Sequence, residues 1–262
     1  RSSLSRDGRR TSASELRCHL PCVAFMPEDL SLVGGSPAVR RRFVDNLCAA
    51  LNPLYVFRLN EHHRLVRHRS KLLAFKEDDI SAVRVQAPLA VWIWSKRQEA
   101  VCYLQEEVGW TSELSFPFDI SLRKGGCEVE GDLLEGFWES WENLRRLERK
   151  SGVPLIGPQR DDLTINVLGR PAKYLSRGHK KRVAISLMMA ASRALEKRLR
   201  RSPLLLLDEV ASELDEEGKK ILFRYLLEAK WQVFAATASG PIQGWPGAVW
   251  RVDDGKVAKL SG

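Results

Sequence analysis

The chain contains 262 residues, of which 44% are hydrophobic and 29% are charged, and its formal net charge is +9. This length and composition predict a globular protein with one large domain or two smaller ones, and the positive charge favours a polyanionic partner. The apolar run of residues 88–94 is much shorter than the roughly 20 residues of a membrane helix, so we expect no membrane partner. The five cysteines, an odd number without C-x-x-C spacing, are expected to be free thiols of a cytoplasmic protein.

The first predicted elements are a strand at residues 19–25 and a helix that follows a Gly-Gly pair. Ser36 is a favoured N-cap residue, and a proline follows it at the first helical position. The first two turns carry Arg40, Arg41 and Arg42, whose positive charges oppose the helix dipole. This unfavourable placement indicates either an anionic partner or an acidic neighbour within the fold.

A second helix is predicted at residues 54–75, and residues 36–76 hold nine Lys or Arg residues against two acidic ones. A charged helix face is either solvated or in contact with nucleic acid, and both interpretations are open here. The arginines predicted to contact DNA are Arg40, Arg41, Arg42, Arg64 and Arg67. Three histidines in the second helix, His62, His63 and His68, lack cysteines or acids at ligand spacing, so a metal site is disfavoured.

The middle of the chain is predicted to be mainly helical. Residues 79–107 have a helical pattern with an interruption at Pro88, residues 116–122 alternate as in a strand, and residues 132–150 form another helix. The dense turn motif Gly-Pro-Gln-Arg-Asp-Asp of residues 157–162 then leads into a further, half-buried strand.

A long helix is predicted to begin at the Leu-Ser-Arg-Gly of residues 175–178. Ser176 is a favoured N-cap residue, and Gly178 lies in the first turn among basic residues. Free backbone amides and the helix dipole converge at such a start, which makes it a suitable receptor for phosphate. The alternative is a helix start that binds nothing.

Residues 203–209 combine a proline, four leucines and two carboxylates, which is typical of a buried parallel strand that ends in Asp208 and Glu209. Ligands of open α/β sheets bind at the carboxyl ends of strands. The two acids are therefore placed to handle a Mg²⁺-nucleotide and an attacking water. The alternative is a core strand that ends in two solvated acids.

Three features stand in a recognisable order: the Leu-Ser-Arg-Gly helix start, the Leu-Leu-Leu-Leu-Asp-Glu strand and the Ser-Glu-Leu-Asp that follows it. This order resembles the ATPase heads of ABC-type and SMC-like proteins. More narrowly, the chain resembles the RecF family of DNA replication and repair proteins. The residues that carry this resemblance are Pro-Glu-Asp-Leu at 27–30, Gly-Ser-Pro and Arg-Arg-Arg-Phe at 35–43, and the turn at 157–162.

The resemblance implies roles for individual residues. Asp208 matches the Walker B aspartate that supports Mg²⁺, and Glu209 would orient or activate the attacking water. His179 stands where the signature motif usually has Gln. The residues implied to bind ATP are Ser176, Arg177 and Gly178 of the signature, which face the ATP of the opposite subunit, together with Asp215 of the D-loop at 212–215, Thr237 at the switch position and Glu28 at the Q-loop.

The resemblance also implies a fold and partners. The fold is expected to be α/β, an SMC-like, ABC-type P-loop ATPase head at residues 1–35 and 151–262 with an inserted, mainly helical arm at residues 36–150. The cofactors would be ATP and Mg²⁺, and the protein would form an ATP-dependent homodimer on double-stranded, single-stranded or junction DNA. The expected protein partners are RecO, RecR and RecA, in recombinational repair and the SOS response.

One family element is absent from the sequence. No G-x-x-x-x-G-K-[ST] loop occurs in the 262 residues, which begin at Arg1 without a methionine. We therefore expect an N-terminally truncated member that hydrolyses ATP negligibly by itself. The alternatives are a DNA-binding or scaffold protein without catalysis, and another SMC-type or ABC-type ATPase.

Overall fold

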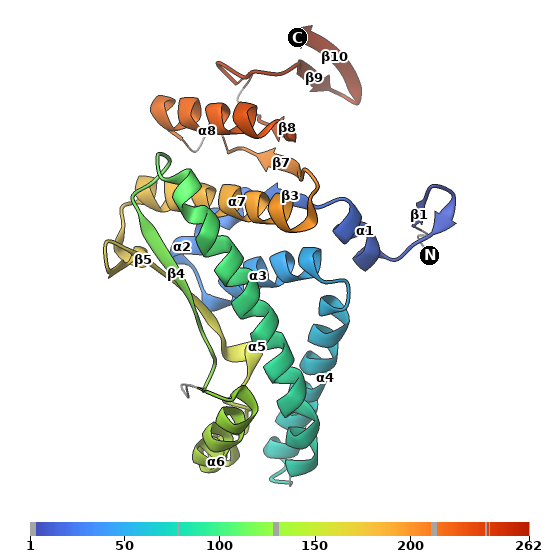
Figure 1. The fold of residues 1–262 in the computed structure, drawn as a ribbon, viewed down its shortest axis with the longest axis vertical. Helices are drawn as coiled ribbons and strands as arrows, with labels where there is room; N and C mark the ends of the chain where they lie inside the picture. Colours follow the sequence, from blue (N-terminus) through green and yellow to red (C-terminus); the bar gives the residue numbers. More distant parts are fainter. Residues whose placement is uncertain are drawn as a thin grey trace.

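The computed structural model describes residues 4–77, 79–127, 131–210, 214–238, 240 and 242–261. An α/β part lies at one end, and a helical arm extends away from it (Figure 1). The helices are α1 (Ala13–His19), α2 (Ser31–Gly34), α3 (Pro37–Leu51), α4 (Tyr55–Ala74), α5 (Ile80–Val108), α6 (Leu133–Ser151), α7 (Arg177–Leu199) and α8 (Glu216–Ala229). None of the helices in these residues is long and apolar enough to cross a membrane.

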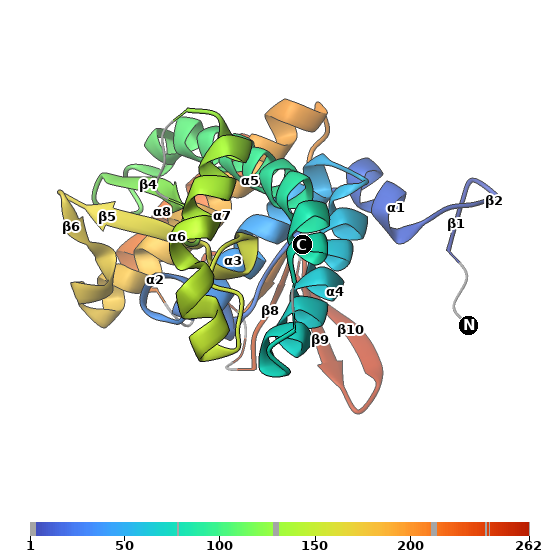
Figure 2. The ribbon, with the colours of Figure 1, turned by 90° about the horizontal axis from the view of Figure 1, so that it is seen from below.

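The strands form four small sheets. They are β1 (Ser5–Arg6), β2 (Arg9–Arg10), β3 (Cys22–Phe25), β4 (Phe118–Arg123), β5 (Asp162–Val167), β6 (Arg170–Pro171), β7 (Leu204–Asp208), β8 (Gln232–Ala236), β9 (Val249–Asp253) and β10 (Lys256–Ser261). The β1–β2 hairpin and the β4-β5-β6 sheet lie at opposite ends of the molecule (Figure 2). The elements that bear on function are the β3-β7-β8 sheet and the helices next to it.

The β3-β7-β8 sheet is parallel throughout. Leu205 and Leu207 of β7 are buried in a core that also contains residues of α7 and α8. The opposite face carries Leu206, which is 37% exposed, and Phe234, which is 58% exposed. The predicted parallel strand that ends at Asp208 is therefore confirmed, but only one of its two faces is covered.

The strand predicted at residues 19–25 is shorter than expected. Residues 13–19 are instead helix α1, because Ser12 and Glu15 form a capping box at its start. Only Cys22–Phe25 pair with β7, in the register Cys22↔Leu204 to Phe25↔Leu207.

The helix interruption predicted at Pro88 is wrong, since α5 continues through this residue. Proline removes one helical hydrogen bond, but Pro88 is solvent-exposed, so water can reach the carbonyl that loses its partner. Burial of Leu89, Ile93 and Trp94 on the other side holds the helix in place.

The predicted helices at residues 54–75 and 132–150, the helix that starts after Ser176 and the strand near residues 116–122 are confirmed as α4, α6, α7 and β4. Strand β4 pairs with β5 in antiparallel fashion, from Phe118↔Val167 to Arg123↔Asp162. This pairing crosses the domain boundary expected at residue 150. Helix α3 also contributes to the core that contains α7, so the arm and the head pack together at this junction.

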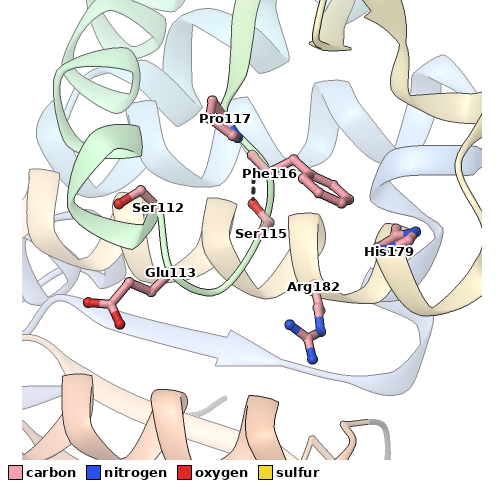
Figure 3. A pocket seen from close by; sticks show the side chains of 7 residues that line it. All are labelled: Ser112, Glu113, Ser115, Phe116, Pro117, His179 and Arg182. Carbon is pink, nitrogen blue, oxygen red and sulfur yellow. Dashed lines mark hydrogen bonds between the residues drawn. The ribbon is translucent and has the colours of Figure 1, made fainter.

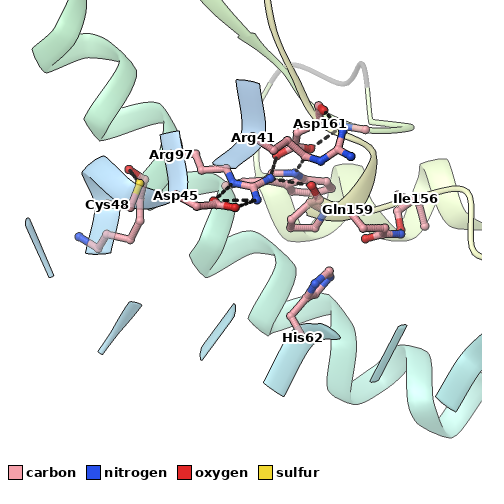
Figure 4. Close-up of polar contacts among 12 residues, drawn as sticks. Arg41, Asp45, Cys48, His62, Arg97, Ile156, Gln159 and Asp161 are labelled. Atoms are coloured by element: carbon pink, nitrogen blue, oxygen red, sulfur yellow. Dashed lines mark hydrogen bonds and ion pairs between the residues drawn. The ribbon is translucent and has the colours of Figure 1, made fainter. Parts of the chain in front are cut away.

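Arg97 of α5 is the centre of a buried charge cluster between arm and head. Its guanidinium donates hydrogen bonds to Asp45 at 2.9 and 3.0 Å, to Asp161 at 2.6 Å and to the Pro158 carbonyl at 2.6 Å (Figure 4). Trp94 donates to the other carboxylate oxygen of Asp161 at 2.8 Å. Burial raises the pKa of Asp161, while the charge of Arg97 lowers it. One cation and two carboxylates thus join α3, α5 and the turn at residues 158–161.

Gly125, which follows β4, forms hydrogen bonds with this turn. Its N–H donates to Asp161 at 2.7 Å, and its carbonyl accepts from the Gly157 N–H at 2.9 Å. A Cβ atom at position 125 would lie 2.3 Å from the Cβ of Arg160, so no larger residue fits without displacement. Gly157 has a φ of 125°, a region that favours glycine. The turn motif at residues 157–162 therefore packs closely against Gly125 and has a structural role.

Arg69 of α4 is the centre of a second buried cluster, deeper in the arm. It donates to Asp79 at 2.8 Å, Gln86 at 2.9 Å and Glu148 at 2.6 Å, and so joins α4, α5 and α6. The Nε2 atom of His62 lies 3.3 Å from the amide nitrogen of Gln86. Its Nδ1 atom has no hydrogen-bond partner in the described chain, and burial lowers the pKa of His62 to about 3.

Candidate functional site

The candidate site lies at the carboxyl edge of the parallel sheet. Because β3, β7 and β8 run in the same direction, the residues that follow them meet at one edge. These residues include Glu28 in the 3-10 turn Pro27–Leu30, Asp208 and Glu209 after the leucine run, and Thr237 after β8. The topology thus brings together four residues that were predicted from separate parts of the sequence.

Asp208 has an open carboxylate at this edge. It is half-buried at the end of β7, and in the described ranges no hydrogen bond or ion pair engages its side chain. Carboxylate oxygens are preferred ligands of Mg²⁺, which is usually held by one or two carboxylates together with phosphate oxygens and water. Asp208 fits this requirement. Among the described residues, no group of three His, Cys, Asp or Glu side chains could hold a metal ion by itself.

Glu209 is held in a fixed orientation next to Asp208. Its backbone has a φ of 54°, an uncommon conformation for a residue other than glycine, and its N–H donates to the Ala236 carbonyl at 3.0 Å. The carboxylate accepts hydrogen bonds from the Ala238 N–H at 2.5 Å and from the Thr237 hydroxyl at 3.3 Å. Strained backbone conformations often occur at functional sites. Glu209 and Thr237 therefore form one unit at the tip of the sheet.

The second half of the site is the start of α7. Ser176 is its N-cap, and the Ser176 hydroxyl accepts from the His179 N–H at 3.3 Å. Ser176, Arg177 and Gly178 are all accessible to solvent, and a Cβ atom built on Gly178 would meet nothing within 4 Å. The first turn is therefore open to a ligand or to a partner surface, and its contact with a phosphate stays a prediction.

Asp215 joins α8 to α7. Its carboxylate caps α8 by accepting from the Gly218 N–H at 3.0 Å, and it receives two hydrogen bonds from Arg182 of α7, at 2.7 and 2.8 Å. The hydrogen bonds from Arg182 and Gly218 lower the pKa of Asp215. Of the predicted D-loop at residues 212–215, Ser212 and Glu213 lie outside the described residues.

A cavity of about 270 Å³ lies beside the start of α7. It is lined by Ser112, Glu113, Ser115, Phe116 and Pro117 from the loop that follows α5, and by His179 and Arg182 from α7 (Figure 3). The aromatic rings of Phe116 and His179 lie close together, with centroids 4.9 Å apart. Sequence reasoning missed this contact, because the two residues are far apart in the chain and Phe116 has no motif around it.

Two of the predicted DNA-binding arginines have internal partners instead. Arg40 donates to both carboxylate oxygens of Asp162, at 2.7 and 3.1 Å, and to the Gly35 carbonyl at 2.8 Å. Arg41 donates to the Asp161 carbonyl at 2.8 Å. Of the two explanations for the arginine cluster, the acidic neighbour within the fold is therefore correct for Arg40, whose side chain is 12% exposed. These contacts give both residues a structural role.

Three other arginines remain accessible. The side chain of Arg42 is 64% exposed and lies 3.8 Å from Asp29. Arg64 and Arg67 are exposed on α4. These residues present positive charge to solvent, and their contact with DNA stays a prediction.

Comparison with known proteins identifies the family. No protein-family model matches the chain. The DNA replication and repair protein RecF of Chloroflexus aurantiacus is 31% identical in an alignment of 275 positions, which covers 96% of this chain and 70% of the relative. The chain belongs to the RecF family. RecF of Geobacillus sp. (strain WCH70) is 31% identical over 241 residues, which cover 84% of this chain and 63% of the relative, so the chain spans about two thirds of these proteins.

Two solved structures show the fold. The recombination mediator protein RecF in complex with ATPrS matches 99% of this chain and 73% of its own length, with a TM-score of 0.83 and 22% identity. RecF with ATP matches 97% of this chain and 72% of its own length, with a TM-score of 0.78 and 22% identity. The α/β ATPase-head fold predicted from the sequence is confirmed, and the RecF-family chain is related to proteins of DNA replication and repair.

Proposed function

We propose that this RecF-family chain is part of a DNA-binding ATPase of recombinational repair, whose reaction site forms between two copies of the protein. The observation that carries the proposal is the edge of the sheet, where the open carboxylate of Asp208 lies next to Glu209, which Thr237 and a backbone amide hold in place. An acidic strand end of this kind suits Mg²⁺-assisted phosphoryl transfer to water. Solved relatives described as RecF with ATP support nucleotide binding.

Each residue has a distinct part in this proposal. ATP with Mg²⁺ supplies the phosphoryl group and the charge neutralisation, and Asp208 would hold the metal. Glu209 accepts a proton from water or orients it, and the hydrogen bonds from Thr237 and Ala238 fix its carboxylate for that task. Glu28 lies at the same edge of the sheet, in the turn after β3.

The start of α7 would serve the other copy. Ser176, Arg177 and Gly178 are accessible, and the first-turn amides and the helix dipole favour an anion in front of them. The proposed homodimer would place this surface against the γ-phosphate held by the partner subunit. Asp215, held by Arg182 of α7, would lie near the same interface.

DNA would bind to the exposed arginines Arg42, Arg64 and Arg67, because accessible cations gain affinity by releasing counterions from the phosphate backbone. The relatives of known structure are described as members of the RecFOR pathway. Gapped or junction DNA, with RecO and RecR as partners in loading RecA, is therefore the context that we propose.

The test combines sedimentation and DNA binding in the full-length protein. We expect ATP to drive dimerisation, and the variant Ser176→Arg to abolish it, because a large cation at the N-cap blocks the first turn of α7. The matched control is Ser202→Arg, which adds the same side chain at an exposed position far from α7's start in the sequence. ATP-dependent dimers of Ser176→Arg would contradict the proposed interface, and DNA binding unaffected by ATP would favour a scaffold protein.

A further inference from the structure

His179 connects the N-cap of α7 to the arm. Its Nδ1 atom lies 2.9 Å from the hydroxyl oxygen of Ser176, and its ring packs against Phe116 of the loop at residues 112–117 (Figure 3). His179 thus touches Ser176 through both its backbone N–H and its ring. In the family signature this position is usually Gln, so the contact is a feature of this chain's own sequence.

The position of one proton decides what the Ser176 hydroxyl can do. The hydroxyl has one hydrogen to donate and two lone pairs to accept with. If Nδ1 of His179 carries no hydrogen, the Ser176 hydrogen points to Nδ1 and is not available to a ligand. If Nδ1 carries a hydrogen, the imidazole donates to the oxygen, and the hydroxyl hydrogen is free to point out of the helix toward an anion.

The arm loop keeps the His179 ring in this position. Phe116 covers the ring from the loop side, and Glu113 of the same loop forms an ion pair with Arg224 of α8. Just before the loop, Trp110 packs edge-on against Tyr225, with ring centroids 4.9 Å apart. The loop is therefore fixed to the head at the point where the long helix α5 of the arm ends.

Charged groups from three elements line or adjoin the cavity beside His179. Glu113 of the loop and Arg182 of α7 line it, and Asp215 at the start of α8 is bound to Arg182. Arg182 is thus neutralised by Asp215, and Glu113 by Arg224. A phosphate in front of α7 would accept the Ser176 hydrogen, which leaves the hydroxyl oxygen to accept a hydrogen bond from Nδ1.

We propose that His179 is a positioning residue that directs the hydroxyl hydrogen of Ser176 toward a phosphate. In this proposal, Phe116 of the arm loop holds the His179 ring next to Ser176. This inference rests on the proposed function, in which α7 of one copy contacts the nucleotide of the other. It adds to that function a dependence on which ring nitrogen of His179 carries a hydrogen and on the placement of the arm loop.

The first test needs no nucleotide. Imidazole ¹⁵N spectra of the 262-residue chain, with the His179 signals assigned by His179→Gln, report which ring nitrogen accepts a hydrogen bond. We expect neutral His179 to accept at Nδ1, and both Ser176→Ala and Phe116→Ala to shift the Nδ1 signal. Ser112→Ala, at an exposed position of the same loop, is the control. A His179 spectrum that neither Ser176→Ala nor Phe116→Ala changes would overturn the inference.

The second test crosses two substitutions in the full-length protein, measured as ATP-dependent self-association. Phe116→Ala should weaken association severalfold in the original protein, because the His179 ring loses the contact that holds it beside Ser176. The same substitution should have no effect in the His179→Gln background, since a glutamine at this position bonds the N-cap backbone and leaves the Ser176 hydroxyl free.

The second test distinguishes a failure of the proposed function from a failure of the role proposed for His179. If the original protein shows no ATP-dependent association, the proposed function fails. If it associates but Phe116→Ala weakens association equally in the presence and absence of His179→Gln, the positioning role of His179 fails while the proposed function stands.

Discussion

The junction between arm and head and the carboxyl edge of the sheet both concentrate charged side chains, but they use them differently. At the junction, Arg97 is enclosed by Asp45 and Asp161, and its guanidinium has acceptors close by. At the edge, Asp208 faces no partner in the described residues, and the start of α7 is accessible. Charged groups whose hydrogen bonds are made within the protein stabilise the fold, whereas charged groups with free hydrogen-bonding capacity are available for a ligand.

This distinction separates residues that look alike in the sequence. Arg40 and Arg42 lie two positions apart in the same arginine run, yet one is bonded to Asp162 and the other is exposed. A count of basic residues therefore overestimates the positive surface that is accessible to a ligand. Substitutions at the junction should therefore change stability, whereas substitutions at the edge should change activity.

The largest effect is expected at the edge. In the full-length protein, Glu209→Gln should lower ATP hydrolysis by about 10²- to 10⁴-fold, the usual contribution of a general base. The amide introduced by this substitution is a poor base. Its oxygen can still accept from the Ala238 N–H and its NH2 group can donate to the Thr237 hydroxyl, so unfolding by urea should be almost unchanged. Equal steady-state hydrolysis by this variant would remove Glu209 from the reaction.

At the junction, Arg97→Met should destabilise the 262-residue chain by about 3–5 kcal/mol, because it leaves the buried carboxylate of Asp161 and the partly buried carboxylate of Asp45 without their cation. The matched control is Arg84→Met on the same helix, which removes an exposed arginine and should change stability by less than about 0.5 kcal/mol. Urea denaturation measures both. Similar denaturation midpoints for the two variants would mean that the buried cluster contributes little to stability.

A smaller effect concerns acid stability. His62 has a pKa of about 3 in the fold because it is buried, whereas an unfolded histidine titrates near ~6.5. The unfolded chain therefore binds a proton that the folded chain does not, so this group makes stability fall as the pH drops from about 6.5 toward 3. His62→Leu should remove about 2 kcal/mol of the stability lost between about pH 7 and pH 5.

The control for this experiment is His68→Leu, an exposed histidine of the same helix. This variant supplies the pH profile with which that of His62→Leu is compared. If both variants show the pH profile of the original chain, protonation of His62 in the unfolded state does not contribute to acid sensitivity.

The smallest effects are expected on the basic surface. Each of Arg64→Ala and Arg67→Ala should weaken DNA binding modestly and reduce the slope of log affinity against log salt by about 0.7–0.9, the value of one lost phosphate contact. Lys259→Ala removes the same charge from the β9–β10 hairpin and serves as the control. A slope that changes equally in all three variants would indicate a general charge effect instead of a defined surface.

Those parts of the fold that depend on local patterns could be predicted from the sequence. The cap at Ser176, the apolar strand before Asp208 and the helix that begins at Pro37 follow from residues within a few positions of one another. The acids at strand ends could also be assigned to one edge, because parallel topology alone brings them together.

What the sequence could not predict depends on distant partners. Asp162 lies 122 residues from Arg40, and Phe116 reaches His179 only because α5 and the following loop pack on the head. Pro88 is tolerated because of its exposure, which its neighbours in the sequence do not reveal. Each of these outcomes is decided by tertiary packing that overrides a local tendency.

The open face of the β3-β7-β8 sheet has a practical consequence for handling the chain. Ala24, Leu206 and Phe234 stand side by side in the strand register, and the last two are well exposed. A contiguous apolar row of this kind favours association between molecules. The isolated 262-residue chain should therefore bind hydrophobic dyes in its folded state, and its solubility should rise when Phe234 is replaced by a polar residue such as threonine.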